Sequence, residues 1–249
     1  MTASRAYTHI DASTIKVANV SIQRSWSSFM AQSFSLYAEK QGKEWLEQAG
    51  SETEMQVDGQ RLGVMDFPEK SWSEAYSPFG AGVFLEQCGQ GLRLITENIA
   101  LHESPGLICS SVLRNTSRQK KSICAFCLDA WRMPPAKLLI HSHDFSQQHT
   151  SLSQESHERA LAVSCGQDGL ILGAEGGGRY DFFSPDPQQC AIVYTEEISL
   201  GPGESWQSPY SFVLPYQGSI QDVLGRDYAA LLRVIMKKRT LALEQESAS

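Results

Sequence analysis

The sequence predicts an all-β protein in which two large antiparallel sheets stack on each other and one C-terminal helix follows. Short runs of β-branched and aromatic residues recur along the chain, with Pro, Gly, Asn and charged residues between them. The segment 91–131 contains several such runs and no helical period, as expected of a meander in the middle of a sheet. A helical period appears only after residue 219.

Length and composition agree with a single globular domain. The 249 residues can bury one large core, and the 41% hydrophobic and 20% charged fractions are ordinary for such a protein. We find no apolar run of the roughly 18 residues that would span a membrane, and no secretory signal pattern, so we expect a cytoplasmic protein without a membrane partner. A net charge of −7 argues against a nucleic-acid partner, and the six cysteines are predicted to be reduced.

The N-terminal third is predicted to contain short strands and one long loop. Residues 1–14 are polar and are predicted to be flexible, and residues 15–22 alternate like a first strand with a bulge. Residues 34–45 favour two strands around a turn at 41–42 over a broken helix, and Asp58-Gly59 is the strongest hairpin signal in the chain. Residues 66–82 (DFPEKSWSEAYSPFGAG) read as a long, functional loop.

The remaining strands are predicted from apolar runs that end at turn residues. They span 92–94, 99–101, 107–112, 123–128, 137–141, 159–165, 169–173, 180–183, 190–199 and 206–214. The sandwich therefore covers 15–218. A helix follows over 219–240, with Ser219 at the N-cap, Asp222 at N3 and basic residues in the last turn, and 241–249 form a flexible tail.

The pair Cys124 and Cys127 has the CxxC spacing of zinc and redox sites. On one strand, residues three apart point to opposite faces, so the two thiols are not expected to converge. We predict that they pack as small apolar groups, and that the protein uses neither a metal nor a cofactor.

His141 and His143 lie two apart on a predicted strand, which places both imidazoles on one face. This geometry suits hydrogen bonds to a polyol, and a metal site or a plain surface loop are the alternatives. A polyol site needs rim donors beside an aromatic face. We expect the accessible tryptophans to be Trp72 and Trp131, so the predicted carbohydrate-binding residues are Trp72, Tyr76, Trp131, His141 and His143.

The last fifty residues carry a family resemblance. Residues 198–209 (ISLGPGESWQSP), followed by 212–214 and a helix with Tyr228, resemble the close of the β-supersandwich that precedes the catalytic barrel in family 36 α-galactosidases. Residues 112–117 are similar to a strand end of galactose mutarotase-like sandwiches, and 74–80 (EAYSPFG) are loosely similar to one of their loops. The resemblance implies a galactose mutarotase-like β-supersandwich and a carbohydrate ligand. The barrel of the family is missing from this sequence.

Three functions follow from these observations. The preferred one is a carbohydrate-associated, non-catalytic sandwich domain that partners a glycoside hydrolase barrel, on the same or a separate chain. The first alternative is a stand-alone sugar epimerase with His141 and His143 as acid and base. The second is a structural assembly domain without a ligand. The sequence identifies no catalytic residue and leaves a homo-oligomer open.

Overall fold

The computed structural model describes residues 5–50, 52–133, 139–143, 159–175, 180–183 and 189–247. The described strands, in chain order, are β1 (Tyr7–Ile10), β2 (Thr14–Ala18), β3 (Ile22–Ser27), β4 (Ser33–Ala38), β5 (Lys43–Glu44), β6 (Glu54–Val57), β7 (Gln60–Gly63), β8 (Glu69–Ser77), β9 (Gly80–Gly89), β10 (Leu92–Leu101), β11 (Leu107–Asn115), β12 (Lys121–Cys124), β13 (Phe126–Arg132), β14 (Leu139–His143), β15 (Arg159–Cys165), β16 (Asp168–Ala174), β17 (Tyr180–Phe183), β18 (Gln189–Tyr194), β19 (Ile198–Leu200), β20 (Ser205–Gln207) and β21 (Ser211–Gln217).

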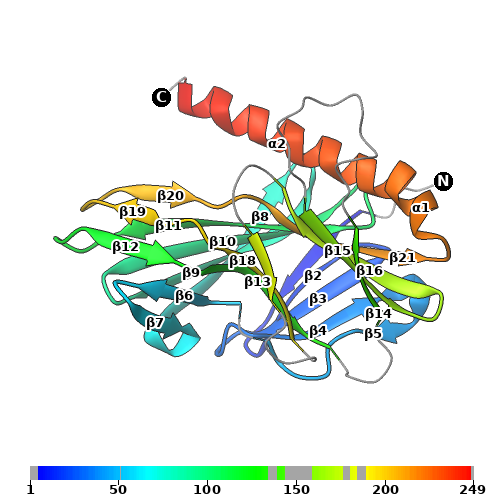
Figure 1. Ribbon diagram of the computed structural model, residues 1–249, viewed down its shortest axis with the longest axis horizontal. Coiled ribbons are helices and arrows are strands. Elements are labelled where there is room, and N and C mark those ends of the chain that lie inside the picture. The colour runs from blue at the N-terminus through cyan, green and yellow to red at the C-terminus, as the bar shows by residue number, and fades with distance from the viewer. Residues whose placement is uncertain are drawn as a thin grey trace.

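These strands form a two-layered antiparallel sandwich (Figure 1). One layer is a nine-stranded sheet in the order β14-β15-β16-β21-β11-β10-β9-β8, with β20 also paired to β11. The other layer consists of a five-stranded sheet (β1 to β5 in order), a four-stranded sheet (β19-β12-β6-β7) and a three-stranded sheet (β13-β18-β17). Apolar side chains from all four sheets make one continuous core between the layers. The predicted all-β sandwich is confirmed.

The C-terminal helix covers the outer face of the nine-stranded sheet (Figure 1). It begins with α1 (Ile220–Val223), continues through a π-helical turn (Leu224–Tyr228) and ends with α2 (Ala229–Ser247). Ser219 is the N-cap residue, as predicted, although its side chain makes no capping hydrogen bond. The predicted end at 240 is wrong, because the strong helix formers of the following LALEQES segment continue the helix to Ser247.

The N-terminus is more ordered than the sequence indicates. Residues 7–10, predicted to be flexible, form β1 and pair with β2. The polar character of β1 reflects a strand that is exposed or half-exposed at every position. The predicted single strand over 15–22 is also wrong, because the chain reverses between β2 and β3. Asn19 fixes this turn, since its Oδ1 accepts hydrogen bonds from the backbone N–H groups of Ser21 (2.9 Å) and Ile22 (3.1 Å).

The predicted loop at 66–82 is largely a strand. β8 pairs with β9 from Glu69 opposite Cys88 to Ser77 opposite Gly80. In the strand order of the described residues, β8 is the outermost strand of the nine-stranded sheet and tolerates the polar and charged residues that masked its alternation. Trp72 and Tyr76, which were expected on a long loop at the rim, therefore lie on a regular strand.

Hairpins read from local signals are confirmed. Asp58 and Gly59 have φ of 50° and 83°, as a type I′ turn between β6 and β7 requires. β4 and β5 pair as predicted, with Gly42 at φ 61° after a 3₁₀ turn. The central meander is confirmed for β10 and β11, where the predicted runs 92–94 and 99–101 form the single strand β10, and the preceding strand β9 was not predicted. β12 and β13 join two other sheets, and Ala125, at φ 51°, lies between them.

Candidate functional site

A surface pocket of about 560 Å³ lies where the C-terminal helix begins. Its volume falls in the range of roughly 300–1,000 Å³ that is typical of small-molecule sites. We call it the α1 pocket. It is lined by Val20, Ser21, Lys40, Gln41, His102, Glu103, Ser104, Pro105, Pro215, Tyr216, Gln217, Val223, Arg226 and Asp227. These residues come from the β2–β3 turn, the β4–β5 turn, the β10–β11 loop, the end of β21 and the start of the helix.

One wall of the α1 pocket is fixed by the buried side chain of Asn19. Its Nδ2 donates to the carbonyl oxygens of Leu101 (3.2 Å), Ser104 (3.1 Å) and Gly106 (3.2 Å). The same amide closes the β2–β3 turn through its oxygen. The Asn19 side chain thus connects the β2–β3 turn, which carries Val20, to the β10–β11 loop, which carries His102 and Glu103.

The opposite wall is fixed by Gln41. Its Nε2 donates to the carbonyl oxygens of Gly169 (3.0 Å) and Tyr216 (2.7 Å), and its Oε1 accepts a hydrogen bond from Trp45 Nε1 (2.7 Å). The β4–β5 turn is therefore attached to β16 and β21. Because both walls are held by several hydrogen bonds each, the pocket is formed before any ligand enters.

The polar rim of the α1 pocket contains both hydrogen-bond donors and hydrogen-bond acceptors. Arg226 forms a two-point ion pair with Asp227, at 2.9 Å and 3.0 Å. His102 Nδ1 accepts a hydrogen bond from the Ala6 N–H (3.1 Å), so the neutral ring carries its hydrogen on Nε2. Among the described residues, neither Lys40 nor Glu103, both exposed, has a hydrogen-bond or ion-pair partner.

Replacing Asn19 by Ala is expected to lower the free energy of unfolding by about 2 kcal/mol, because it removes all the hydrogen bonds that this buried amide side chain makes. Urea unfolding of both proteins measures the difference. Gln23→Ala on the adjoining strand serves as the control and is expected to stay within about 0.5 kcal/mol of the parent. An Asn19→Ala variant as stable as this control would contradict the wall assignment.

A second cluster of charged residues lies in the core. The Arg24 guanidinium donates to both carboxylate oxygens of Asp129, at 2.6 Å and 2.8 Å, and contacts Glu52 at 2.9 Å. Trp26 Nε1 donates to Glu52 (2.8 Å), and the rings of Trp26 and Trp131 flank the guanidinium at 5.2 Å and 5.8 Å. Burial raises the pKa of Asp129 to about 6, against the lowering effect of Arg24. The cluster ties β3 to β13 across two sheets.

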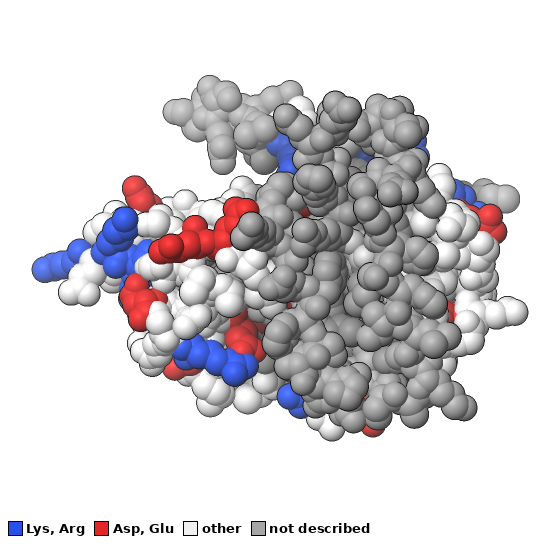
Figure 2. Space-filling model, viewed as in Figure 1, with Lys and Arg blue, Asp and Glu red and all other residues white. Residues whose placement is uncertain are grey.

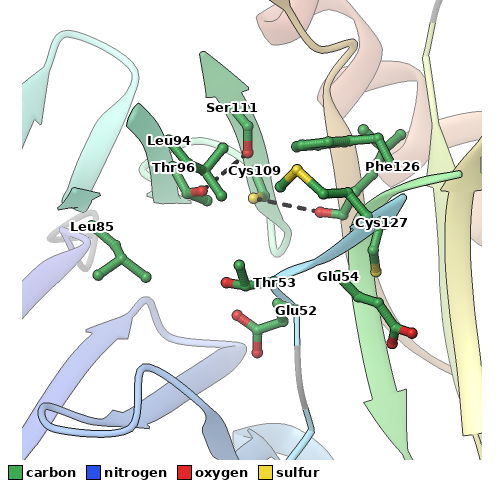
Figure 3. Close-up of a pocket in the computed structure, with 12 residues that line it drawn as sticks. Glu52, Thr53, Glu54, Leu85, Leu94, Thr96, Cys109, Ser111, Phe126 and Cys127 are labelled. Carbon is green, nitrogen blue, oxygen red and sulfur yellow. Dashed lines mark hydrogen bonds between the residues drawn. The ribbon is translucent and has the colours of Figure 1, made fainter. Parts of the chain in front are cut away.

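The space beside this cluster is too small for a sugar. The pocket whose lining residues are drawn in Figure 3 has a volume of about 10 Å³, the size of a single water molecule. Its lining includes Glu52 and the sulfur-bearing side chains of Cys109 and Cys127. Burial raises the pKa of both thiols well above the ordinary value, so neither is a reactive thiolate. The cluster ties two sheets of one layer together, and the cavity beside it has no room for substrate chemistry.

The predicted carbohydrate-binding residues do not gather at one place. Trp72 and Tyr76 stand four residues apart on β8. Trp72 is half-buried against Trp26, with ring centres 6.1 Å apart, and Tyr76 is 72% exposed. The expectation that Trp131 is accessible is wrong: it is 0% exposed, because β13 turns its ring into the core over Arg24.

The backbone of His141 and His143 lies on β14, two positions apart and paired with β15. This is the strand placement that the sequence predicts. The side chains of both residues fall outside the part of the chain that the structure describes. Their acid–base role therefore stays a prediction.

Cys124 and Cys127 belong to different strands, not to the single strand assumed from the sequence. Cys124 ends β12 and donates to Gln56 Oε1 (3.3 Å), whereas Cys127 is buried in β13. In the described ranges, no three His, Cys, Asp or Glu side chains gather as metal ligands.

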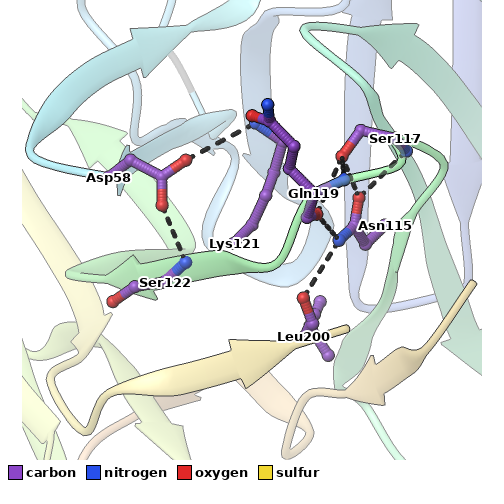
Figure 4. Close-up of polar contacts among 7 residues, drawn as sticks. All are labelled: Asp58, Asn115, Ser117, Gln119, Lys121, Ser122 and Leu200. Atoms are coloured by element: carbon purple, nitrogen blue, oxygen red, sulfur yellow. Dashed lines mark hydrogen bonds and ion pairs between the residues drawn. The ribbon is translucent and has the colours of Figure 1, made fainter. Parts of the chain in front are cut away.

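The strand end at 112–117 serves the fold. Asn115 is fully buried, and its Nδ2 donates to the carbonyl oxygens of Gln119 (2.7 Å) and Leu200 (3.0 Å) (Figure 4). Beside it, the Asp58 carboxylate of the β6–β7 hairpin accepts a hydrogen bond from the Ser122 N–H (2.9 Å). This network joins β11, β12, β19 and the hairpin, so Asn115 is committed to structural contacts.

Basic and acidic side chains are mixed on the part of the molecule that Figure 2 draws in colour. Figure 2 shows basic and acidic side chains intermixed over the end of the molecule that carries β12 and β19, with no extended basic patch on the part drawn in colour. None of the helices in the described ranges is both long and apolar enough to cross a membrane.

Comparison with known proteins finds solved structures with a similar fold. No protein-family model matches the sequence, and no curated protein matches it in sequence. The family GH36 α-galactosidase AgaB from Geobacillus stearothermophilus is similar in structure, with a TM-score of 0.57 and 8% identity over 85% of this chain and 41% of that chain. The α-N-acetylgalactosaminidase NagBb from Bifidobacterium bifidum gives 0.56 and 10% over 91% and 39%, and an α-mannosidase from Enterococcus faecalis gives 0.54 and 10% over 90% and 32%.

The chain has a sandwich fold similar to that of part of each of these glycosidases. This agrees with the supersandwich fold that the resemblance of residues 198–214 implied. The TM-scores of 0.54 to 0.57 show that the fold is shared, and the sequence identities of 8–10% leave the activity open. The chain spans at most about two fifths of the length of these three enzymes.

The α1 pocket escaped prediction from the sequence. Its polar residues come from segments that are separated by up to about 200 positions, and each of them is unremarkable alone. The one local signal was the Glu103–Gly106 turn, which we read only as a break between strands.

Proposed function

We propose that this chain is a non-catalytic, carbohydrate-binding sandwich domain that works beside a glycoside hydrolase barrel, on the same or a separate chain. One observation carries the proposal. Between 85% and 91% of the chain matches 41% and 39% of two glycosidases, an α-galactosidase and an α-N-acetylgalactosaminidase. The rest of each enzyme lies outside the matched region.

The chemistry of the described residues supports a binding role over a catalytic one. The buried Asp129 and the half-buried Glu52 are paired with Arg24 beside a cavity of about 10 Å³. A general acid must reach the glycosidic oxygen, which this position does not permit. The α1 pocket, in contrast, is open, polar and large enough for a small molecule.

Incubation with nitrophenyl α-galactoside, α-N-acetylgalactosaminide and α-mannoside tests the absence of catalysis. We expect no release of nitrophenol above the rate in buffer. Turnover that co-elutes with the protein and rises in proportion to its concentration would contradict the non-catalytic assignment.

Calorimetric titration with galactosides, glucosides and uronic acids tests the binding role. We expect a saturable heat with at least one of these sugars. Flat titrations with all of them would contradict carbohydrate binding and favour the structural assembly domain.

A further inference from the structure

We propose that the α1 pocket is a binding site for an uncharged saccharide unit, held by the Lys40 ammonium and the Glu103 carboxylate. The proposal rests on the proposed function and names the place and the ligand chemistry. Lys40 and Glu103 are exposed and line the same pocket. Neither forms an ion pair or hydrogen bond with another described residue, although residues of opposite charge line the same pocket.

The balance of charge selects the ligand class. The pocket is lined by two cations, Lys40 and Arg226, and by two anions, Glu103 and Asp227. Because these charges cancel, an anionic or cationic ligand gains no net attraction. A sugar hydroxyl both donates and accepts, so a pyranose can bond to the ammonium and to the carboxylate at the same time.

The rest of the lining suits the same ligand. His102 is oriented by the Ala6 N–H on its Nδ1, which leaves Nε2–H as a further donor. Val20, Pro105 and Val223 supply apolar surface for the C–H face of a ring. The walls are fixed in advance by Asn19 and Gln41, so binding does not require ordering of the loops.

The test is calorimetric titration of the whole chain with methyl α-galactoside and methyl α-glucoside. Galactose 6-phosphate serves as the anionic comparison. Glu103→Gln and Lys40→Met are each expected to weaken the affinity about tenfold, the loss expected for one hydrogen bond to a charged group. Val20→Trp fills the exposed mouth of the pocket and is expected to abolish binding.

Matched controls separate the pocket from general charge effects. Glu39→Gln and Lys237→Met remove exposed charges outside the pocket and are expected to leave the affinity within about twofold of the parent. Thermal unfolding of each variant shows that the fold is retained, and the exposed position of all five side chains predicts little change in Tm.

The other possible results would contradict the α1 pocket, the uncharged ligand or carbohydrate binding itself. Parent-like affinity in Glu103→Gln, Lys40→Met and Val20→Trp overturns the α1 pocket and leaves the proposed function intact. Tighter binding of galactose 6-phosphate that Glu103→Gln further strengthens overturns the uncharged ligand. No binding of any probe by the parent protein overturns both the pocket and carbohydrate binding.

Discussion

Arg24→Met is expected to lower the free energy of unfolding by about 3–5 kcal/mol, because it leaves the buried carboxylate of Asp129 and the half-buried carboxylate of Glu52 without their shared cation. Urea unfolding at neutral pH measures the loss. The double variant Arg24→Met/Asp129→Leu removes the uncompensated charge at Asp129 and is expected to recover much of the stability. A double variant that is less stable than Arg24→Met alone would contradict this account.

The loss in Arg24→Met is expected to depend on pH in a defined direction. Burial already raises the pKa of Asp129 to about 6, and without Arg24 it rises further, while the unfolded chain keeps a pKa of about 3.9. A carboxyl whose pKa is higher in the folded state stabilises the fold below the unfolded pKa, and this stability is lost as the pH rises through the folded pKa. The variant should therefore lie closer to the parent at pH 5 than at pH 8, and equal losses would contradict this mechanism.

Leu231→Ala is expected to lower the free energy of unfolding by about 3 kcal/mol, within the range of 2–5 kcal/mol for such truncations. Leu231 is fully buried between the helix and the outer face of the nine-stranded sheet, in the cluster that also holds Phe212 and Tyr228. Chemical denaturation measures the loss. Met236→Ala, 48% exposed on the same helix, is the control and is expected to change stability by less than about 0.5 kcal/mol.

Leu231 affects the α1 pocket as well as the stability of the fold. The helix start contributes Val223, Arg226 and Asp227 to the α1 pocket, so its attachment to the sheet keeps that wall in place. Leu231→Ala variants that unfold like the parent would mean that the helix is held mainly by contacts outside this cluster.

The parts of the fold that local chemistry decides were predictable. Asp58-Gly59 makes its hairpin because a type I′ turn needs residues that accept positive φ, and the helix shows its period directly. The strand β8 was missed because an outermost strand can be polar along most of its length. The reversal at Asn19 was missed because its amide is held partly by carbonyl groups more than 80 residues away.

The candidate site depends on long-range contacts to a still greater degree. Whether Trp131 faces water depends on how β13 is tilted against Arg24, and no spacing in the sequence encodes that depth. The α1 pocket exists only because Asn19 and Gln41 bring distant turns together. The fold class could therefore be predicted from the sequence, and the position of the α1 pocket could not.

Saturation-transfer difference NMR of the purified chain with methyl α-galactoside tests the central claim most directly, because one experiment reports both binding and turnover. We expect saturation transfer from the protein to the ring protons of the sugar, and an anomeric signal that stays unchanged throughout the measurement. Absence of transfer with this sugar and, in the same experiment, with the glucosides and uronic acids would contradict carbohydrate binding. The growth of a free galactose signal would contradict a domain that does no chemistry of its own.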